Sequence, residues 1–310
     1  MAKTTKDPGF GHGSKLGAKR IINKDGSSNI VHINRKSNVN DLYSYLISIS
    51  WTKFFIFILA GYILINVAFG LLYTFIGIDQ ITTETGNFLT DFLHGFFFSA
   101  QTITTVGYGG IAPEGVSASV ISTFEALLGL LSFSFITGLL YGRFSKPRAS
   151  IHFSDNMVLT QFKNGRALMF RLMNNRKNIM IEPEVTVTLS ISKKDNDGNY
   201  KRTFYNLDLE RRNITYLPTI WTIVHEIDSD SPLFSYEDKE IVKLDAELYI
   251  LAQYHEQSFS QKVYQMFSYH FDQIKAGHKF VQSSSFDESG YTILDHKLLN
   301  KTVSNIETVL

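Results

Sequence analysis

Two long apolar segments dominate the hydrophobic pattern of the chain. Residues 54–78 contain no charged side chain, and residues 116–142 contain only one, Glu125. With a rise of about 1.5 Å per residue, a helix over either segment is long enough to cross a hydrocarbon core of about 30 Å. We therefore predict two transmembrane helices, because core helices of soluble proteins rarely reach this length without a charge.

A third apolar segment, residues 92–100, is too short to cross a bilayer, so we predict a re-entrant pore helix over about residues 90–103. It leads directly into a non-helical segment with the sequence Thr104, Thr105, Val106, Gly107, Tyr108 and Gly109. Non-helical backbone at membrane depth is tolerated only where protein or an aqueous pathway satisfies its carbonyl groups. Two glycines one residue apart allow successive carbonyls to face the same way, as a cation filter requires.

The filter sequence TVGYG is the signature of potassium channels, whose filter carbonyls replace the hydration shell of the ion. We therefore expect K+ as the permeant ion, bound at residues 104–109, and no other metal or cofactor. One such segment cannot enclose an ion, so four copies of the chain are expected to form a homotetramer.

Charged residues are divided unevenly along the chain, and the division predicts the topology. Residues 1–53 hold nine Lys and Arg against three Asp and Glu, residues 54–142 hold five acids and no base, and residues 143–310 hold 21 of each. Basic residues flank membrane spans on the cytoplasmic side. Both termini are therefore expected in the cytoplasm, with residues 79–115 outside.

The net charge of +1 and the absence of cysteine narrow the function classes. The whole chain has neither the basic excess of a nucleic-acid-binding protein nor the cysteines of a disulfide or thiol site. Its histidines show no metal-site spacing, and no set of nucleophile, base and orienting residue appears. We therefore expect neither an enzyme nor a nucleic-acid partner.

The segments on either side of the spans have their own periodicities. Apolar residues spaced three and four apart predict an amphipathic interfacial helix over residues 40–53, capped by Asn40 or Asp41. After residue 150, alternating apolar and polar residues with turns at Asp197-Gly198 and Asn164-Gly165 predict an antiparallel β-sandwich. No Gly-x-Gly-x-x-Gly motif follows a strand there, so a Rossmann-type nucleotide sensor is not expected.

Beyond these patterns, the chain resembles the inward-rectifier potassium channels, and most closely their prokaryotic (KirBac) branch. The residues that carry the resemblance are Lys24-Asp25-Gly26, the filter, the basic residues after the second span, and the motif that extends from Val224 to Leu233 (VHEIDSDSPL). The resemblance implies an immunoglobulin-like cytoplasmic domain that extends the pore, and a position in the bacterial inner membrane.

The resemblance also implies roles for residues of the second span and the tail. Phe133, Thr137 and Tyr141, each four apart, would line the cavity, with Tyr141 at a hydrophobic gate. Gly138 and Gly142 would act as hinges, or as small residues for helix packing. Strong rectifiers carry an acid where Phe133 stands, so we expect weak block by Mg2+ or polyamines, from the acidic position Glu182 alone.

Two more groups of residues receive roles. Gln101 and the basic residues are assigned through the resemblance, and Glu125 because an acid at lipid depth is costly and is expected to face protein. Gln101 and Glu125 are expected to support the filter from behind. Anionic lipids or phosphoinositides are expected at the inner leaflet, where each basic residue contributes about 1 kcal/mol of attraction. The residues expected to bind these lipids are Trp51, Lys53, Arg143, Lys146 and Arg148.

These interpretations divide the chain into a cytoplasmic N-terminal segment (1–39), an interfacial helix (40–53), a pore domain (54–142), a tether (143–149) and a β-sandwich (150–310). The first span would cover residues 54–78 and the second residues 116–142. Two alternatives remain open: a non-rectifying potassium leak channel with a ligand-sensing tail, and a membrane-anchored binding module with a vestigial pore.

Overall fold

The computed structural model describes residues 4–15, 19–34, 39–83, 85–147, 149–195 and 197–304. The chain folds into two compact units. We call Asn34–Lys146 the helical unit, and Met1–Ile33 together with Pro147–Leu310 the β unit. The β unit is therefore discontinuous in sequence, because the helical unit is inserted between its N-terminal 33 residues and the rest.

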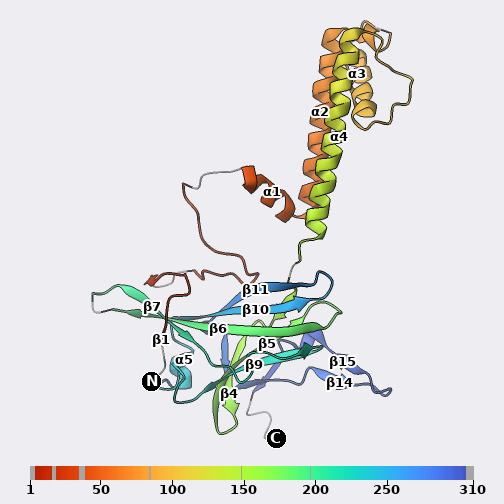
Figure 1. Cartoon of the computed structure of the whole chain (residues 1–310). Coiled ribbons are helices and arrows are strands. Elements are labelled where there is room, and N and C mark those ends of the chain that lie inside the picture. Colours follow the sequence, from red (N-terminus) through yellow and green to blue (C-terminus); the bar gives the residue numbers. More distant parts are fainter. Residues whose placement is uncertain are drawn as a thin grey trace. The chain divides into compact units, whose positions relative to one another are not determined.

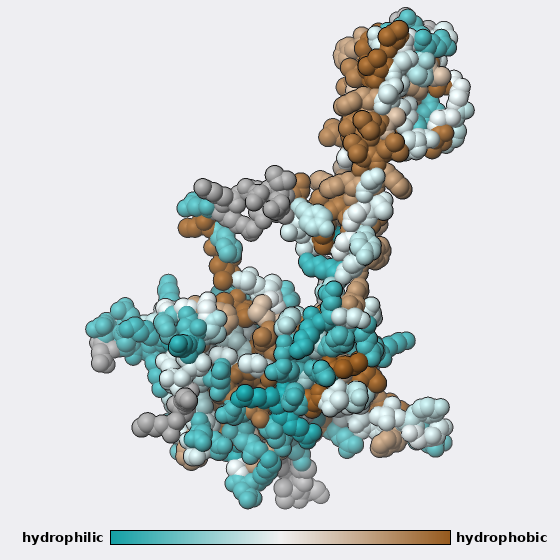
Figure 2. Space-filling view, viewed as in Figure 1, coloured by the Kyte–Doolittle hydropathy of each residue, from teal (hydrophilic) through white to brown (hydrophobic). Residues whose placement is uncertain are grey.

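Within the helical unit, two long helices run side by side, with a shorter one packed near one end (Figure 1). The elements are α1 (Val39–Ser48), α2 (Trp51–Ile76), the short 3-10 helix η1 (Ile78–Gln80), α3 (Phe88–Ile103) and α4 (Val116–Phe144). Both α2 and α4 are long and apolar enough to span a membrane. Hydrophobic side chains gather on the outer surface of this unit in Figure 2.

The interfacial helix differs from its prediction. Instead of one helix over residues 40–53, α1 starts at Val39 and ends at Ser48, and α2 starts at Trp51. The side chain of Ser50 accepts a hydrogen bond from the backbone N–H of Lys53 at 3.4 Å, so it caps α2 and separates the helices. Residues 51–53 therefore belong to the first turn of the spanning helix α2.

Glycines bring α3 close to both long helices. A Cβ atom added at Gly95 of α3 would lie 2.7 Å from the carbonyl oxygen of Gly70 on α2. A Cβ atom at Gly129 of α4 would overlap the carbonyl oxygen of Ile103 at the end of α3. Neither position has room for a side chain, so these two glycines allow α3 to pack closely against α2 and α4.

The β unit is a sandwich of two sheets around one hydrophobic core. The first sheet has the order β1-β7-β6-β10-β11, with β2 paired to β7 and β8 to β6; the second has the order β12-β4-β5-β3, with β9 paired to β5. The strands of the first sheet are β1 (Thr4–Thr5), β2 (Gly13–Ser14), β6 (Met180–Lys194), β7 (Tyr200–Asn206), β8 (Tyr216–Leu217), β10 (Ala246–Glu256) and β11 (Gln261–His270). Those of the second sheet are β3 (Ile151–Phe153), β4 (Met157–Phe162), β5 (Gly165–Asn174), β9 (Ile220–Ile227) and β12 (Ile274–Ala276).

Smaller elements complete the β unit. Two two-stranded sheets pair β13 (His278–Phe280) with β16 (Thr302–Ser304) and β14 (Ser284–Phe286) with β15 (Thr292–Leu294). Short helices are α5 (Asp238–Ile241), η2 (Phe271–Gln273) and η3 (His296–Leu298). In Figure 2, hydrophilic residues cover much of this unit.

The sandwich corrects two details of the prediction. β12 pairs with β4 in parallel, so the structure is not wholly antiparallel. In the β4–β5 hairpin, Phe162 pairs with Gly165, so the two-residue loop is Lys163-Asn164 and not Asn164-Gly165. Lys163, the first residue of this loop, takes the left-handed conformation, with φ 52°.

The N-terminal segment packs on the outer face of the first sheet, which the sequence did not indicate. Phe10 lies 4.4 Å, centroid to centroid, from the ring of Tyr249 on β10. Phe10 belongs with Ile22 to a hydrophobic cluster around Tyr249. The Tyr249 hydroxyl donates a hydrogen bond to Oε2 of the buried Glu247, with 2.5 Å between the two oxygens. Among the described residues, Glu247 Oε1 is buried without a hydrogen-bond partner. The pKa of Glu247 is raised above its ordinary value, because the effect of burial outweighs that of the groups that lower it. Those groups are the Tyr249 hydroxyl and the charges of Arg202, His270 and Arg20.

We predict that Glu247→Gln stabilises the β unit at alkaline pH. The unfolded state loses its proton from Glu247 near its ordinary pKa, whereas the folded state holds that proton to higher pH, so stability falls as pH rises between the two values. Removing the charge should raise the free energy of unfolding by about 1 kcal/mol at pH 8, with little effect near pH 4. Thermal unfolding of the purified channel at both pH values measures this. The matched change Glu288→Gln, at an exposed position, should have no effect, and equal effects of the two variants would contradict the prediction.

Candidate functional site

The residues after α3 have the backbone geometry of an ion filter. Thr105, Gly107 and Gly109 have φ values of 58°, 54° and 86°, whereas Val106 and Tyr108 between them do not have positive φ. Alternation between left- and right-handed backbone turns successive carbonyl groups to the same side of the segment. The segment is exposed along its length in the single chain, so its carbonyls are free to face an ion.

Gln101 in the last turns of α3 holds this segment. Its backbone carbonyl accepts the N–H groups of Val106 at 2.9 Å and Gly107 at 3.3 Å, and its side-chain Oε1 accepts the N–H of Tyr108 at 3.2 Å. Its Nε2 donates to the carbonyl of Ile111 at 3.4 Å. One residue therefore accepts the N–H groups of Val106, Gly107 and Tyr108. The carbonyl groups of the segment take no part in these hydrogen bonds.

Behind the filter, a buried polar cluster joins the three helices α2, α3 and α4. Glu125 of α4 accepts hydrogen bonds from the Tyr73 hydroxyl of α2, at 2.7 Å, and contacts the Ser99 hydroxyl of α3. Ser99 Oγ also lies 3.0 Å from Oδ1 of Asn66 on α2. All four residues are fully buried within one chain. The sequence analysis predicted a role for Glu125 because it is charged. It did not predict the roles of Tyr73, Ser99 and Asn66, which are uncharged.

The residues proposed to line the cavity share one exposed face of α4. Phe133 is 73% exposed and Tyr141 is 75% exposed in the single chain, and Thr137 between them is also exposed. The two hinge candidates differ. A Cβ atom at Gly138 would meet nothing within 4 Å, whereas one at Gly142 would lie 3.2 Å from Tyr43 and Ile47 of α1. Gly142 thus provides close packing against α1.

Arg143 is buried within the helical unit, where its guanidinium group contacts α1 and α2. Its guanidinium group donates to the carbonyls of Leu46 at 2.5 Å and Ile49 at 2.8 Å, at the end of α1. It also lies 4.5 Å from the ring centroid of Trp51 and 4.4 Å from that of Phe54. A cation suits both the carbonyl-rich end of a helix and an aromatic face. These contacts give Arg143 a structural role, because they join α1, α2 and α4.

The other basic residues of the expected lipid site lie in different settings. Lys53 and Lys146 are exposed, and Lys146 Nζ donates to Ser48 Oγ at 3.2 Å. Arg148 lies outside the described residues. Two exposed lysines of the helical unit therefore remain as candidates for contact with acidic headgroups.

Glu182 of the β unit stands at an irregularity of strand β6. It has a φ of 48°, precedes Pro183, and lies where the pairing of β6 with β10 shifts between Gln253 and His255. Its N–H donates to the carbonyl of Thr215 at 2.9 Å. The bulge presents the Glu182 side chain to solvent, as a residue acting on an aqueous pathway requires.

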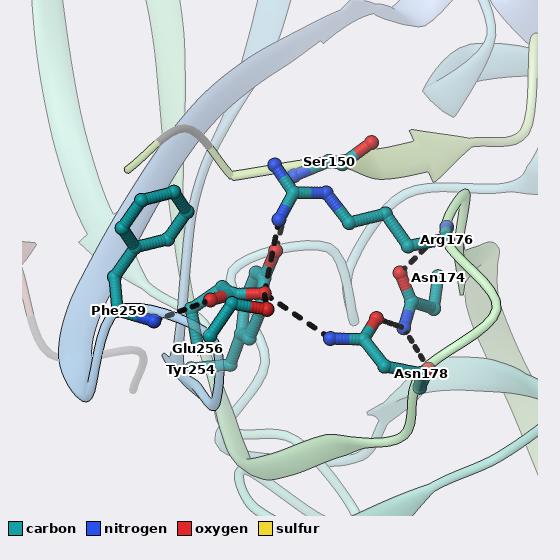
Figure 3. A network of polar contacts seen from close by, with 8 residues as sticks. Ser150, Asn174, Arg176, Asn178, Tyr254, Glu256 and Phe259 are labelled. Carbon is teal, nitrogen blue, oxygen red and sulfur yellow. Dashed lines mark hydrogen bonds and ion pairs between the residues drawn. The ribbon is translucent and has the colours of Figure 1, made fainter. Parts of the chain in front are cut away.

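Another buried carboxylate of the β unit, Glu256, fixes the loop between β10 and β11 (Figure 3). It forms an ion pair with Arg176 at 2.9 Å and accepts hydrogen bonds from Asn178 at 3.1 Å and from the Phe259 N–H at 3.1 Å. Burial would raise the pKa of Glu256, but these donors outweigh it and the pKa is lowered. Arg176 and Glu256 lie 80 positions apart in sequence, so no local pattern could have indicated this contact.

Two spanning helices, a short helix between them and a carbonyl-lined segment after it define a membrane ion channel. The sequence comparisons agree: residues 58–146 match the ion channel family, and residues 151–309 match the inward rectifier potassium channel C-terminal domain. The chain belongs to the inward rectifier potassium channel family. The predicted fold class, a two-span pore followed by a β-rich domain, is thereby confirmed.

Individual relatives support the same assignment. The chain is 34% identical over 278 residues to the inward rectifier potassium channel Kirbac3.1 of Paramagnetospirillum magnetotacticum, covering 89% of this chain and 93% of that protein. It is 25% identical over 305 residues to the G protein-activated inward rectifier potassium channel 3 of Mus musculus, covering 90% of this chain and 76% of that one. The prediction that the chain is an integral membrane channel and not an enzyme is confirmed.

Proposed function

We propose that four copies of the chain form a passive, potassium-selective pore in the bacterial inner membrane, with both termini in the cytoplasm. The observation that carries the proposal is the alternating backbone of Thr105, Gly107 and Gly109, held from behind by Gln101. Its exposed carbonyls become ion ligands only when four segments face one axis. K+ bound at residues 104–109 is then both the substrate and the only metal ion required.

The gate is assigned to Tyr141 on the exposed face of α4. Four converging aromatic rings exclude water from a narrow passage and so block ions by dewetting. Arg143, two residues further on, ties this end of α4 to α1 through the carbonyls of Leu46 and Ile49. A displacement of α1 at the membrane surface is therefore passed to the gate.

Acidic lipids, including phosphoinositides, are proposed to act at Lys53 and Lys146, which lie near this junction within the helical unit. Both side chains are exposed, and Trp51 beside Lys53 suits the headgroup layer. We assume that α1 lies differently in the closed and open states of the channel. Lipid binding then shifts the balance between these states if the lipid binds more tightly to one of them.

Weak rectification is proposed because Phe133 supplies no charge to the cavity, which leaves Glu182 as the acidic site for Mg2+ or polyamines. Two other functions compete with this one. A potassium leak channel with a ligand-sensing β unit would show no such block, and a membrane-anchored binding module with a vestigial pore would show no flux.

Rubidium flux into vesicles reconstituted with the channel tests conduction. Wild type should show flux that barium blocks, and Gly107→Ala should lose most of it, because a side chain at φ 54° costs about 1 kcal/mol in each of four filter segments. The matched change Gly110→Ala, at a position with ordinary φ and open space around it, should keep the flux. Absence of flux in wild type would favour the binding module.

Current–voltage curves with internal spermine test rectification. Wild type should show shallow block, Glu182→Gln should weaken it, and Phe133→Asp should deepen it at least about tenfold, since each added charge contributes roughly 1 kcal/mol. Steep block of the wild-type channel would contradict weak rectification. Complete absence of block would favour the leak channel.

A phosphoinositide titration of rubidium flux tests the lipid contacts. Replacing both Lys53 and Lys146 with Gln should raise the lipid dose for half effect about 30-fold, the equivalent of about 2 kcal/mol. The control Lys239→Gln removes one charge from the short helix α5 and should leave the dose unchanged. An unchanged dose in the double variant would refute the lysine contacts.

A further inference from the structure

The buried cluster around Glu125 contains three hydrogen-bond contacts, but the hydroxyl groups of its other members carry only two hydrogen atoms. Three contacts join its members: Tyr73 to Glu125, Ser99 to Glu125, and Ser99 to Asn66 Oδ1. Each contact needs one hydrogen atom. The hydroxyl groups of Tyr73 and Ser99 provide two, so the third must come from the carboxyl group of Glu125.

Turning the amide of Asn66 over does not remove this requirement. Its Nδ2 donates to the carbonyl oxygen of Tyr62 at 2.6 Å. Exchanging the amide atoms would supply a hydrogen to Ser99 but would place Oδ1 at that distance from the Tyr62 oxygen, where two acceptors repel. The observed orientation of the amide is therefore the one in which every contact is a hydrogen bond.

The sequence of the helical segments offers no lysine or arginine to offset an ionised Glu125. Residues 54–142 contain neither Lys nor Arg, and the groups that face Glu125 from α2 and α3 are Tyr73 and Ser99. The carboxyl group is fully buried within one chain, before any neighbouring subunit or lipid is added. An unpaired charge in such a place is far more costly than a neutral acid.

We propose that Glu125 is a neutral carboxylic acid that donates its proton to Ser99, and that it acts as a positioning residue for the filter. Ser99 in turn donates to Asn66, and the Glu125 carbonyl oxygen accepts from Tyr73, so one chain of bonds joins α4, α3 and α2. Ser99 lies two residues before Gln101 on α3, and Gln101 holds the filter N–H groups. The functional part of this inference rests on the proposed potassium conduction, whereas the protonation state does not.

Infrared spectroscopy of the full-length channel in lipid tests the protonation state. A protonated carboxyl group absorbs above the amide band, where carboxylates do not. At pH 7.5 we expect such a band in wild type and in the exposed-site control Glu288→Gln, and its loss in Glu125→Gln. If the Gln variant does not assemble, Ser99→Ala should shift the same band, because it removes the acceptor of the proton. A wild-type spectrum without a band that depends on Glu125 or Ser99 would overturn the proposal.

The pattern of rubidium-over-sodium selectivity tests the positioning role. Gln at position 125 can donate to Ser99 and accept from Tyr73, so Glu125→Gln should keep selectivity within about twofold. Glu125→Asp keeps the acid but withdraws it by one methylene, and should lower selectivity about tenfold, the equivalent of one broken buried hydrogen bond. The opposite order, with Asp tolerated and Gln not, would show that charge matters and would overturn the neutral acid. An inactive wild type would instead refute conduction and leave the infrared result standing.

Discussion

Backbone that leaves the helix inside a membrane must find partners for its N–H groups within the protein, because lipid offers none. The helical unit is organised around this constraint. Gln101 takes three N–H groups of the filter segment with its two oxygens, and this is possible because α3 ends directly before the segment. Gly95 and Gly129 place α3 against α2 and α4, where no side chain would fit. The N–H groups of Val106, Gly107 and Tyr108 are thus satisfied by a single residue of the preceding helix.

The need to provide partners for backbone groups also explains the contacts of Arg143, near the end of α4. The last carbonyl groups of a helix have no hydrogen-bond partners within it. At the end of α1, the guanidinium group of Arg143 donates to the carbonyl groups of Leu46 and Ile49. The same group lies against the rings of Trp51 and Phe54. A basic residue after a long apolar helix thus serves helix packing.

The sequence predicted the features that depend on local pattern. Span length, the filter motif and strand alternation are local, and the helices and most strands follow from them. Contacts between distant residues left no such trace. The cap at Ser50 divided a helix that periodicity alone had joined, and Tyr73, Ser99 and Asn66 resemble ordinary residues of apolar helices until the fold brings them to Glu125. Arg143 was assigned by its charge and its neighbours in sequence, and its burial could be learned only from α1.

The pairing of β1 and β2 with β7 has a consequence for biogenesis. Thr4 pairs with Tyr205, so the ribosome adds about 200 residues, including both spans, before the first strand meets its partner. The N-terminal segment must remain unpaired while α2 and α4 enter the bilayer, and the first sheet closes only after them. Membrane insertion therefore precedes completion of the β unit, and an error in insertion that left the two ends of the chain on opposite sides of the membrane would prevent that sheet from forming at all.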